Sequence, residues 1–380
     1  MQAMVLCDVA KLELREIWKP APGPHDILVR VAAVGLCGTD FHIFSGLTNF
    51  NKNQKGKPIP LAEIPQILGH EIVGVVAEVG KEVKDLHVGD RVVIDQVLNC
   101  FSRRRQPSCE YCATGDSHQC QFGVEYGITG EPGGFAEYIA IPAVNAIRIN
   151  SDLDNISATI TEPLGCIIHA LDMTMRSRTR YAIGAEDDAF QVHSILIFGA
   201  GPAGLLFTQY LRQELEYEGL ILVSEPVAKK RELAASFGAE TLDPQSIDIT
   251  EAIQEKTHGR KVEFVIDACG SGSAFKSLPD VLRKQSTVLL YGLGHSGLDL
   301  SILNHFQILE TTLVAACGAS GGFDMHRRPL TYIQALELIE SGKIKVDPWI
   351  THRYQSLQEL PQAFTHDYKD PNYIKGVVLP

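Results

Sequence analysis

The feature that most constrains the fold is a glycine-rich turn between an apolar strand and an apolar helix. Residues 194–198 read Ser-Ile-Leu-Ile-Phe, residues 199–204 read Gly-Ala-Gly-Pro-Ala-Gly, and a helical pattern follows. The first glycine permits a tight turn, the second lets the backbone approach a pyrophosphate, and the third allows helix and strand to pack closely. A turn without ligand is the alternative. The expected coenzyme-binding residues are Gly199, Gly201, Pro202, Ala203 and Gly204.

Two patterns divide the chain. From about residue 194, apolar strands alternate with helix-like segments, which is typical of a doubly wound parallel sheet in an α/β domain. Residues 1 to about 163 contain short β-branched runs separated by Gly, Pro and Asp, which predicts a strand-rich domain. We expect residues 176–191 to be the linker, and a helix at 329–341 to lead into an irregular tail. The expected parallel strands are 194–198, 220–224, 263–267, 287–291 and 312–316.

A carboxylate follows the second of these strands. Glu225 lies roughly 20 residues beyond Gly204, where it can accept a hydrogen bond from the ribose 2′-hydroxyl of NAD. The same carboxylate would repel the 2′-phosphate of NADP. Lys230, flanked by Lys229 and Arg231, could instead hold such a phosphate. The sequence favours NAD over NADP.

Four cysteines fall within one loop, namely Cys100, Cys109, Cys112 and Cys120. Two thiols separated by two residues can bind one ion from a single turn, and four thiolates complete a tetrahedral structural zinc site. An iron–sulfur cluster also uses four thiolates, and four unrelated reduced thiols are the remaining alternative. The spacing favours zinc.

Other candidate ligands are dispersed. Cys37 follows an expected strand, His70 and Glu71 precede another, and Glu162 lies where the strand-rich pattern ends. Thiolate, imidazole and carboxylate from different loops are typical of an open catalytic zinc site. Singly, each has a structural alternative, such as a buried thiol, a core histidine or an ion-paired carboxylate.

Composition argues against several classes of protein. The net charge is −12, with 46 acidic and 34 basic residues, whereas proteins that bind nucleic acid by neutralising its phosphates usually have the opposite balance, so we expect no nucleic-acid partner. No apolar stretch reaches roughly 18 residues, and the N-terminus lacks a basic and then apolar leader, so we expect no membrane partner and no secretion. Nine cysteines then point to metal binding or catalysis in a cytoplasmic protein.

Together these motifs resemble the zinc-containing medium-chain alcohol dehydrogenases, and most closely their sorbitol/threonine dehydrogenase branch. The resemblance extends over nearly the whole chain. It implies a GroES-like β-rich catalytic domain, residues 1–163 and 320–380, and an inserted Rossmann NAD-binding domain, residues 164–319. The motifs that carry it are Gly-Leu-Cys-Gly-Thr-Asp-Phe-His at 35–42, Gly-His-Glu at 69–71, Val-Gly-Asp-Arg-Val at 88–92, the cysteine loop, Gly-Gly-Phe-Ala-Glu-Tyr at 133–138, Glu-Pro-Leu at 162–164, the glycine turn, and residues 338–343 and 350–354.

The resemblance also implies a catalytic zinc ligand set. Cys37 and His70 would be ligands, and Glu71 a third or exchangeable one. Glu162 would bind zinc directly or through water, with Cys166 as a minor alternative.

A proton relay is implied as well, formed by Thr39 and His42. Zinc acting as a Lewis acid would favour loss of the proton from the substrate's hydroxyl group. This proton would leave through the relay, and hydride would pass to the nicotinamide ring.

The chain departs from the family pattern in two places. Eight residues, 101–108, separate Cys100 from Cys109, where the family usually has two. The stretch 176–191 is also longer than usual. Either insertion could line the substrate cleft, contribute to an oligomer contact, or be a plain surface loop.

We therefore expect an NAD-dependent zinc dehydrogenase that oxidises a secondary alcohol of a polyol, sugar, sugar acid or hydroxy amino acid. The resemblance implies a homodimer or homotetramer. The alternatives are the same chemistry on a phosphorylated or amino sugar, a zinc-free reductase of the same superfamily, and a non-catalytic zinc-stapled NAD-binding protein. The zinc-free reductase would lack Cys37, His70 and Glu162, and the non-catalytic protein would have no reason to retain Thr39 and His42.

Overall fold

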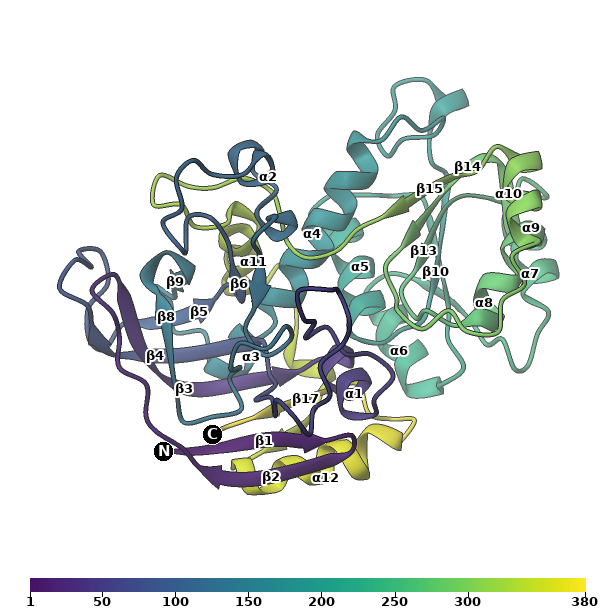
Figure 1. Cartoon of the computed structure of the whole chain (residues 1–380). Coiled ribbons are helices and arrows are strands. Elements are labelled where there is room, and N and C mark those ends of the chain that lie inside the picture. Colours follow the sequence, from purple (N-terminus) through teal and green to yellow (C-terminus); the bar gives the residue numbers. More distant parts are fainter. The chain divides into compact units, whose positions relative to one another are not determined.

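The computed structural model describes all 380 residues, which form two compact units (Figure 1). The first unit comprises Met1–Gly165, Gly318–Gly342 and Val346–Pro380. The second comprises Cys166–Cys317 and Lys343–Lys345. The expected boundaries were 163/164 and 319/320. No helix is long and apolar enough to cross a lipid bilayer.

The second unit contains a six-stranded parallel sheet, as expected for a Rossmann-like α/β domain. Its strands are nearly continuous apolar runs because helices cover a parallel sheet on both faces. Strand order reverses at β10, since β11 and β12 lie on one side of it and the later strands on the other. Such a switch point is where α/β sheets bind ligands. In spatial order the strands are β12 (Glu240–Leu242), β11 (Leu220–Ser224), β10 (Ser194–Phe198), β13 (Val262–Asp267), β14 (Leu282–Leu290) and β15 (Thr312–Ala315).

Short helices connect these strands. The helix after the glycine turn, α5, has proline at its first position, where the missing N–H costs no intrahelical hydrogen bond. The helices are α5 (Pro202–Gln213), α6 (Ala228–Ser236), α7 (Ile249–Lys256), α8 (Gly272–Lys276), α9 (Leu278–Val281) and α10 (Ile302–Leu309).

The first unit is built around a seven-stranded, mostly antiparallel sheet. Its longest strand, β3 (Asp26–Leu36), pairs with β4, β8 and β17 and so connects the two ends of the chain. Inward-facing aliphatic side chains, with Phe135 and Phe364, form its core. The other strands are β4 (Glu71–Val79), β5 (Arg91–Ile94), β8 (Tyr138–Pro142), β9 (Ala146–Arg148), β16 (Ile350–Tyr354) and β17 (Lys375–Val378).

Smaller elements complete this unit. Two small sheets pair β1 (Gln2–Asp8) with β2 (Lys11–Glu16) and β6 (Val97–Leu98) with β7 (Val124–Glu125). The helices are α1 (Gly38–Phe44), α2 (Glu110–Thr114), α3 (Asn155–Ala158), α11 (Leu330–Glu340), α12 (Leu360–Thr365) and the first residues of α4 (Thr161–Arg176).

Two expectations about the chain's organisation were wrong. The C-terminal tail is not irregular, because β17 pairs antiparallel with β3 and parallel with β16. Residues 176–191 are not the linker between the units, because the boundary falls after Gly165, inside α4, and this stretch belongs to the second unit. Its backbone forms a bridge between Ala182 and Gln191.

Candidate functional site

The four loop cysteines lie together in the first unit. Their sulfur atoms are all within 4.8 Å of one another, and those of Cys100 and Cys120 are 3.7 Å apart. Those of Cys109 and Cys120 are 3.9 Å apart. A tetrahedral zinc ion with Zn–S bonds of about 2.3 Å holds its sulfurs about 3.8 Å from one another. The residues present therefore fit a closed structural zinc site.

Backbone donors support the thiolate form in this cluster. The amide of Cys109 donates to Cys100 Sγ over 3.3 Å, and that of Phe122 donates to Cys120 Sγ over 3.4 Å. Burial raises the pKa of the Cys109 thiol, but N–H donors from Cys112 and its neighbourhood outweigh it and lower that pKa to about 6. Burial raises the pKa of both Cys112 and Cys120, so of these three thiols only Cys109 favours the thiolate form without a metal ion. Thiolate character at neutral pH is what a metal ligand requires.

The insertion 101–108 lies on the surface beside this cluster. Its three arginines are exposed. The guanidinium of Arg105 stacks 3.6 Å from the ring centre of Phe122, and Arg103 is 3.7 Å from Glu131. These contacts tie the insertion to the first unit's own surface.

A second group forms where β3 ends and β4 begins. The ligand atoms of Cys37, His70 and Glu71 all lie within 4.8 Å of one another. Antiparallel pairing explains this, because Gly35 of β3 is opposite Glu71 of β4. A Cβ atom on Gly35 would lie 1.9 Å from Glu71 Oε2, so only glycine permits this approach.

Buried atoms without partners support a metal at this second group. Glu71 Oε2 is buried and makes no hydrogen bond, and buried His70 Nδ1 faces only the carboxylate of Asp40, 3.6 Å away. Such atoms are costly unless something satisfies them. A thiolate, an imidazole and a carboxylate form the donor set of an open zinc site, so the residues present fit a catalytic zinc ion.

Asp40 orients this group and was missed by sequence reasoning. Its carboxylate is fully buried and accepts hydrogen bonds from the amides of Cys37, at 2.9 Å, and Gly69, at 3.1 Å. It also lies 3.6 Å from His70 Nδ1. Burial lowers the pKa of His70, but the charges of Asp40 and Cys37 outweigh it and raise that pKa well above its ordinary value. Metal-binding histidines commonly have a carboxylate behind them, and a search for such a carboxylate could have identified Asp40.

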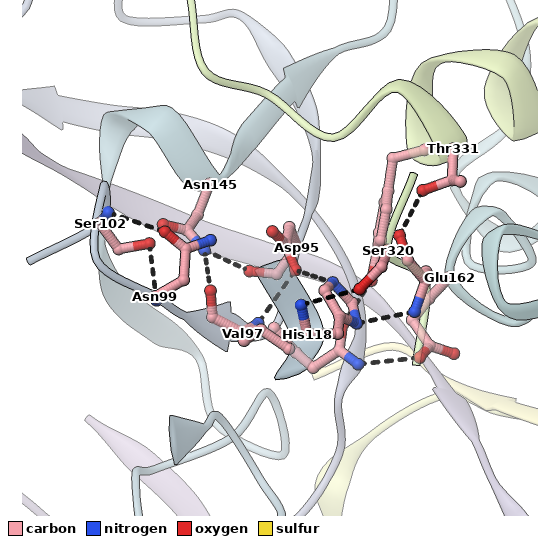
Figure 2. A network of polar contacts seen from close by, with 12 residues as sticks. Asp95, Val97, Asn99, Ser102, His118, Asn145, Glu162, Ser320 and Thr331 are labelled. Carbon is pink, nitrogen blue, oxygen red and sulfur yellow. Dashed lines mark hydrogen bonds and ion pairs between the residues drawn. The ribbon is translucent and has the colours of Figure 1, made fainter. Parts of the chain in front are cut away.

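Glu162 is not one of the three residues whose ligand atoms come together, although its charge acts on Lys375, the partner of Glu71. It is buried in the first turn of α4, and Gln96 Nε2 donates a hydrogen bond to its Oε1 over 3.0 Å. Figure 2 shows Glu162 at one end of a polar network that also contains Asp95 and His118. His118 Nε2 lies 3.2 Å from Asp95 Oδ1.

The residues expected to relay a proton lie on α1. The Thr39 hydroxyl is 3.7 Å from Cys37 Sγ. His42 lies one turn further along the helix and is half-buried, and this burial lowers its pKa. Both side chains therefore start from the helix that Cys37 caps.

The glycine turn in the second unit has the expected conformation. Gly199 has φ of +93°, and a Cβ on Gly204 would lie 2.0 Å from the Gly199 carbonyl oxygen. Glu225, at the end of β11, is buried and accepts hydrogen bonds from the amides of Ala200, at 2.8 Å, and Val227, at 2.9 Å. This carboxylate thus holds the turn itself, a role that the sequence did not indicate. Lys230 is half-buried on α6, and Gly201, Pro202 and Ala203 form the start of α5.

Comparison with known proteins gives matches over both units. The family model described as alcohol dehydrogenase GroES-like domain matches residues 23–151, and that described as zinc-binding dehydrogenase matches residues 202–341. An L-threonine 3-dehydrogenase of Pyrococcus abyssi is 31% identical over 93% of this chain and 90% of its own. An L-galactonate-5-dehydrogenase of Escherichia coli is 27% identical, over 95% of each chain. A crystal structure of a putative zinc-binding dehydrogenase from Sinorhizobium meliloti, bound to NADP, has a TM-score of 0.79 and 28% identity, over 100% of this chain and 99% of that one.

Proposed function

Because the chain belongs to the family of zinc-binding alcohol dehydrogenases, we propose that it oxidises a secondary alcohol of a polar substrate and transfers the hydride to NAD. The substrate class is a polyol, sugar, sugar acid or hydroxy amino acid. The observation that carries this proposal is the convergence of Cys37, His70 and Glu71, with buried ligand atoms that lack partners.

The zinc ligands are assigned from this convergence. Cys37, His70 and Glu71 hold the catalytic ion, and Glu162 is a further carboxylate beside them. When bound, zinc supplies Lewis-acid chemistry that favours loss of the substrate's hydroxyl proton. Cys100, Cys109, Cys112 and Cys120 hold the structural ion.

The chain's own residues move the proton and hold the coenzyme. The Thr39 hydroxyl accepts the substrate's proton as it gives up its own to the coenzyme ribose, and His42, neutral at pH 7 because burial lowers its pKa, takes up the proton from the ribose and passes it to solvent. The turn at Gly199–Gly204 binds the pyrophosphate at the N-terminus of α5. Glu225 holds this turn and favours NAD over NADP.

The proposed substrate class and cellular location are supported by the named relatives and by the cysteine content. The relatives named above act, by their names, on threonine and galactonate, which are both polar molecules with a secondary hydroxyl. Nine free cysteines, four of them grouped as metal ligands, suit the reducing cytoplasm. A homodimer or homotetramer remains our expectation.

The test is a spectrophotometric assay of NAD reduction over a panel of polyols, sugars, sugar acids and L-threonine, with NADP in parallel. Chelator-sensitive turnover of one panel member with NAD supports the whole proposal. Silence across the panel, with two zinc ions still bound per chain, contradicts the substrate class. Phosphorylated and amino sugars are then assayed next.

A further inference from the structure

Gln96 is a fully buried side chain for which the proposed reaction has no use. It lies between β5 and β6, directly after Asp95. The amide of Asp95 donates to the carbonyl of Asn145 over 2.8 Å, and the amide of Tyr126 donates to the carbonyl of Gln96 over 2.9 Å. Its backbone is therefore held on both sides, and its side chain starts from a rigid position.

Two contacts then determine how the Gln96 amide is oriented. The hydroxyl of Tyr332, on α11, donates to Gln96 Oε1, and Gln96 Nε2 donates to Glu162 Oε1 over 3.0 Å. An amide nitrogen can only donate and an amide oxygen can only accept. A flipped amide would set its oxygen against the carboxylate. The arrangement shown therefore holds one oxygen of the Glu162 carboxyl group, Oε1, in a defined position.

We propose that Tyr332 and Gln96 form a positioning pair that holds the Glu162 carboxyl group beside the cluster of Cys37, His70 and Glu71, where it helps retain the bound zinc. The inference rests on the proposed zinc site and assigns it two supporting residues. Neither residue is proposed as a metal ligand. The Tyr332 hydroxyl is bonded to Gln96 Oε1, and the amide nitrogen of Gln96 is bonded to the Glu162 carboxylate, which it orients.

The charge of Glu162 reaches this cluster. Lys375 Nζ lies 2.5 Å from Glu71 Oε1 and is also within reach of the Glu162 charge, so Glu162 lies close to this cluster. Partners of this kind behind metal-binding groups typically change metal affinity or activity by about 10–100-fold when they are removed.

The experiment measures metal release rather than turnover. Zinc retained per chain is followed against increasing chelator in the wild type and in Gln96→Met, which keeps the side-chain length but removes the donor. Cys37→Ser should lack one step of the wild-type release curve, and that step is the release of the catalytic ion. The matched control is Thr331→Val, because Thr331 makes another buried hydrogen bond of the same network, to the carbonyl of Ala319 (Figure 2).

We expect Gln96→Met to release the catalytic ion at about 10-fold lower chelator concentration, and Thr331→Val to behave as the wild type. Cobalt(II) exchanged into the site should show shifted absorption bands in Gln96→Met only. An unchanged release curve and unchanged bands in Gln96→Met, or an equal loss in Thr331→Val, overturns the proposal.

Tyr332→Phe provides a second route if Gln96→Met does not fold, as judged by thermal unfolding. It removes only the hydroxyl that orients the amide, so we expect a smaller loss in the same direction. No change there overturns the role of Tyr332. The readout needs no substrate, so a silent alcohol panel with a weakened metal site contradicts the proposed function while supporting the positioning pair.

Discussion

Lys375 Nζ lies 2.5 Å from Glu71 Oε1, and both side chains are buried, Lys375 in β17, the last strand of the chain, and Glu71 at the first position of β4. The pair joins the two strands that lie on either side of β3. Glu71 is thus shared between an ammonium group and the proposed metal ion. This relationship explains why the tail of the chain folds back onto β3.

Replacing the Lys375 ammonium group should lower the stability of the fold. Lys375→Met leaves a buried carboxylate without its partner, and we expect the free energy of unfolding to fall by about 3 kcal/mol. Urea unfolding of the metal-free protein measures this. Lys256→Met removes a bridge of equal length, 2.5 Å to Glu240, that is partly exposed, so it should cost less than about 1 kcal/mol. Equal effects of the two substitutions would count against the buried pair.

The cysteine cluster predicts a specific change in metal content. Cys112→Ser removes one of four converging thiols, so we expect one zinc ion fewer per chain by metal analysis, with the loop 99–123 becoming sensitive to protease. Cys269→Ser, at an exposed thiol of the second unit, should retain all the zinc. A Cys112→Ser protein with unaltered zinc content would contradict the structural site.

The proton relay predicts a pH dependence. Burial disfavours the charged ring of His42 and lowers its pKa below the ordinary 6.5. His42 therefore stays neutral and able to accept a proton at pH 7, and it becomes charged only as the pH falls below 6.5. We expect kcat/KM for alcohol oxidation to stay high through neutral pH and to decline only in more acid solution.

His42→Asn tests this relay. We expect oxidation at pH 7 to slow by about 100-fold and the acid decline to disappear from the kcat/KM profile. His87→Asn, at an exposed histidine of the same unit, should leave the profile unchanged. A His42→Asn enzyme with the wild-type profile would exclude His42 from the proton path.

We expect coenzyme selection to depend on Glu225. Its carboxylate accepts hydrogen bonds from two backbone amides, and Glu225→Gln can replace only one of them. We expect KM for NAD to rise by about 10-fold while KM for NADP changes less, measured as the ratio of kcat/KM for the two coenzymes. Glu232→Gln, on the helix that follows, α6, is the control. A wild-type enzyme that prefers NADP would contradict the role given to Glu225.

The fold of the second unit could be predicted because the patterns that indicate it lie in short, continuous stretches of the sequence. Strands buried on both faces appear as apolar runs, such as 194–198, and the glycine turn follows directly in sequence. The confirmed doubly wound sheet needed no long-range knowledge. The pairing of β17 with β3 was not predictable, because Lys375 and Gly376 are atypical of a buried strand.

The site was predictable in its residue types but not in its supporting contacts. Cys37, His70 and Glu71 stand in recognisable motifs, whereas Gln96 and Tyr332 are far from Glu162 in sequence and carry no motif of their own. Lys375 is an extreme case, since a lysine in a terminal strand is normally exposed. Only the folded sheet brings it to Glu71.

The most direct test is to measure zinc content and NAD reduction together in the wild type and in Cys37→Ser. We predict two zinc ions per chain and chelator-sensitive NAD reduction in the wild type. Cys37→Ser should retain one ion, in the cysteine cluster, and reduce no NAD. A Cys37→Ser protein that keeps both ions and full turnover would contradict the catalytic site described here.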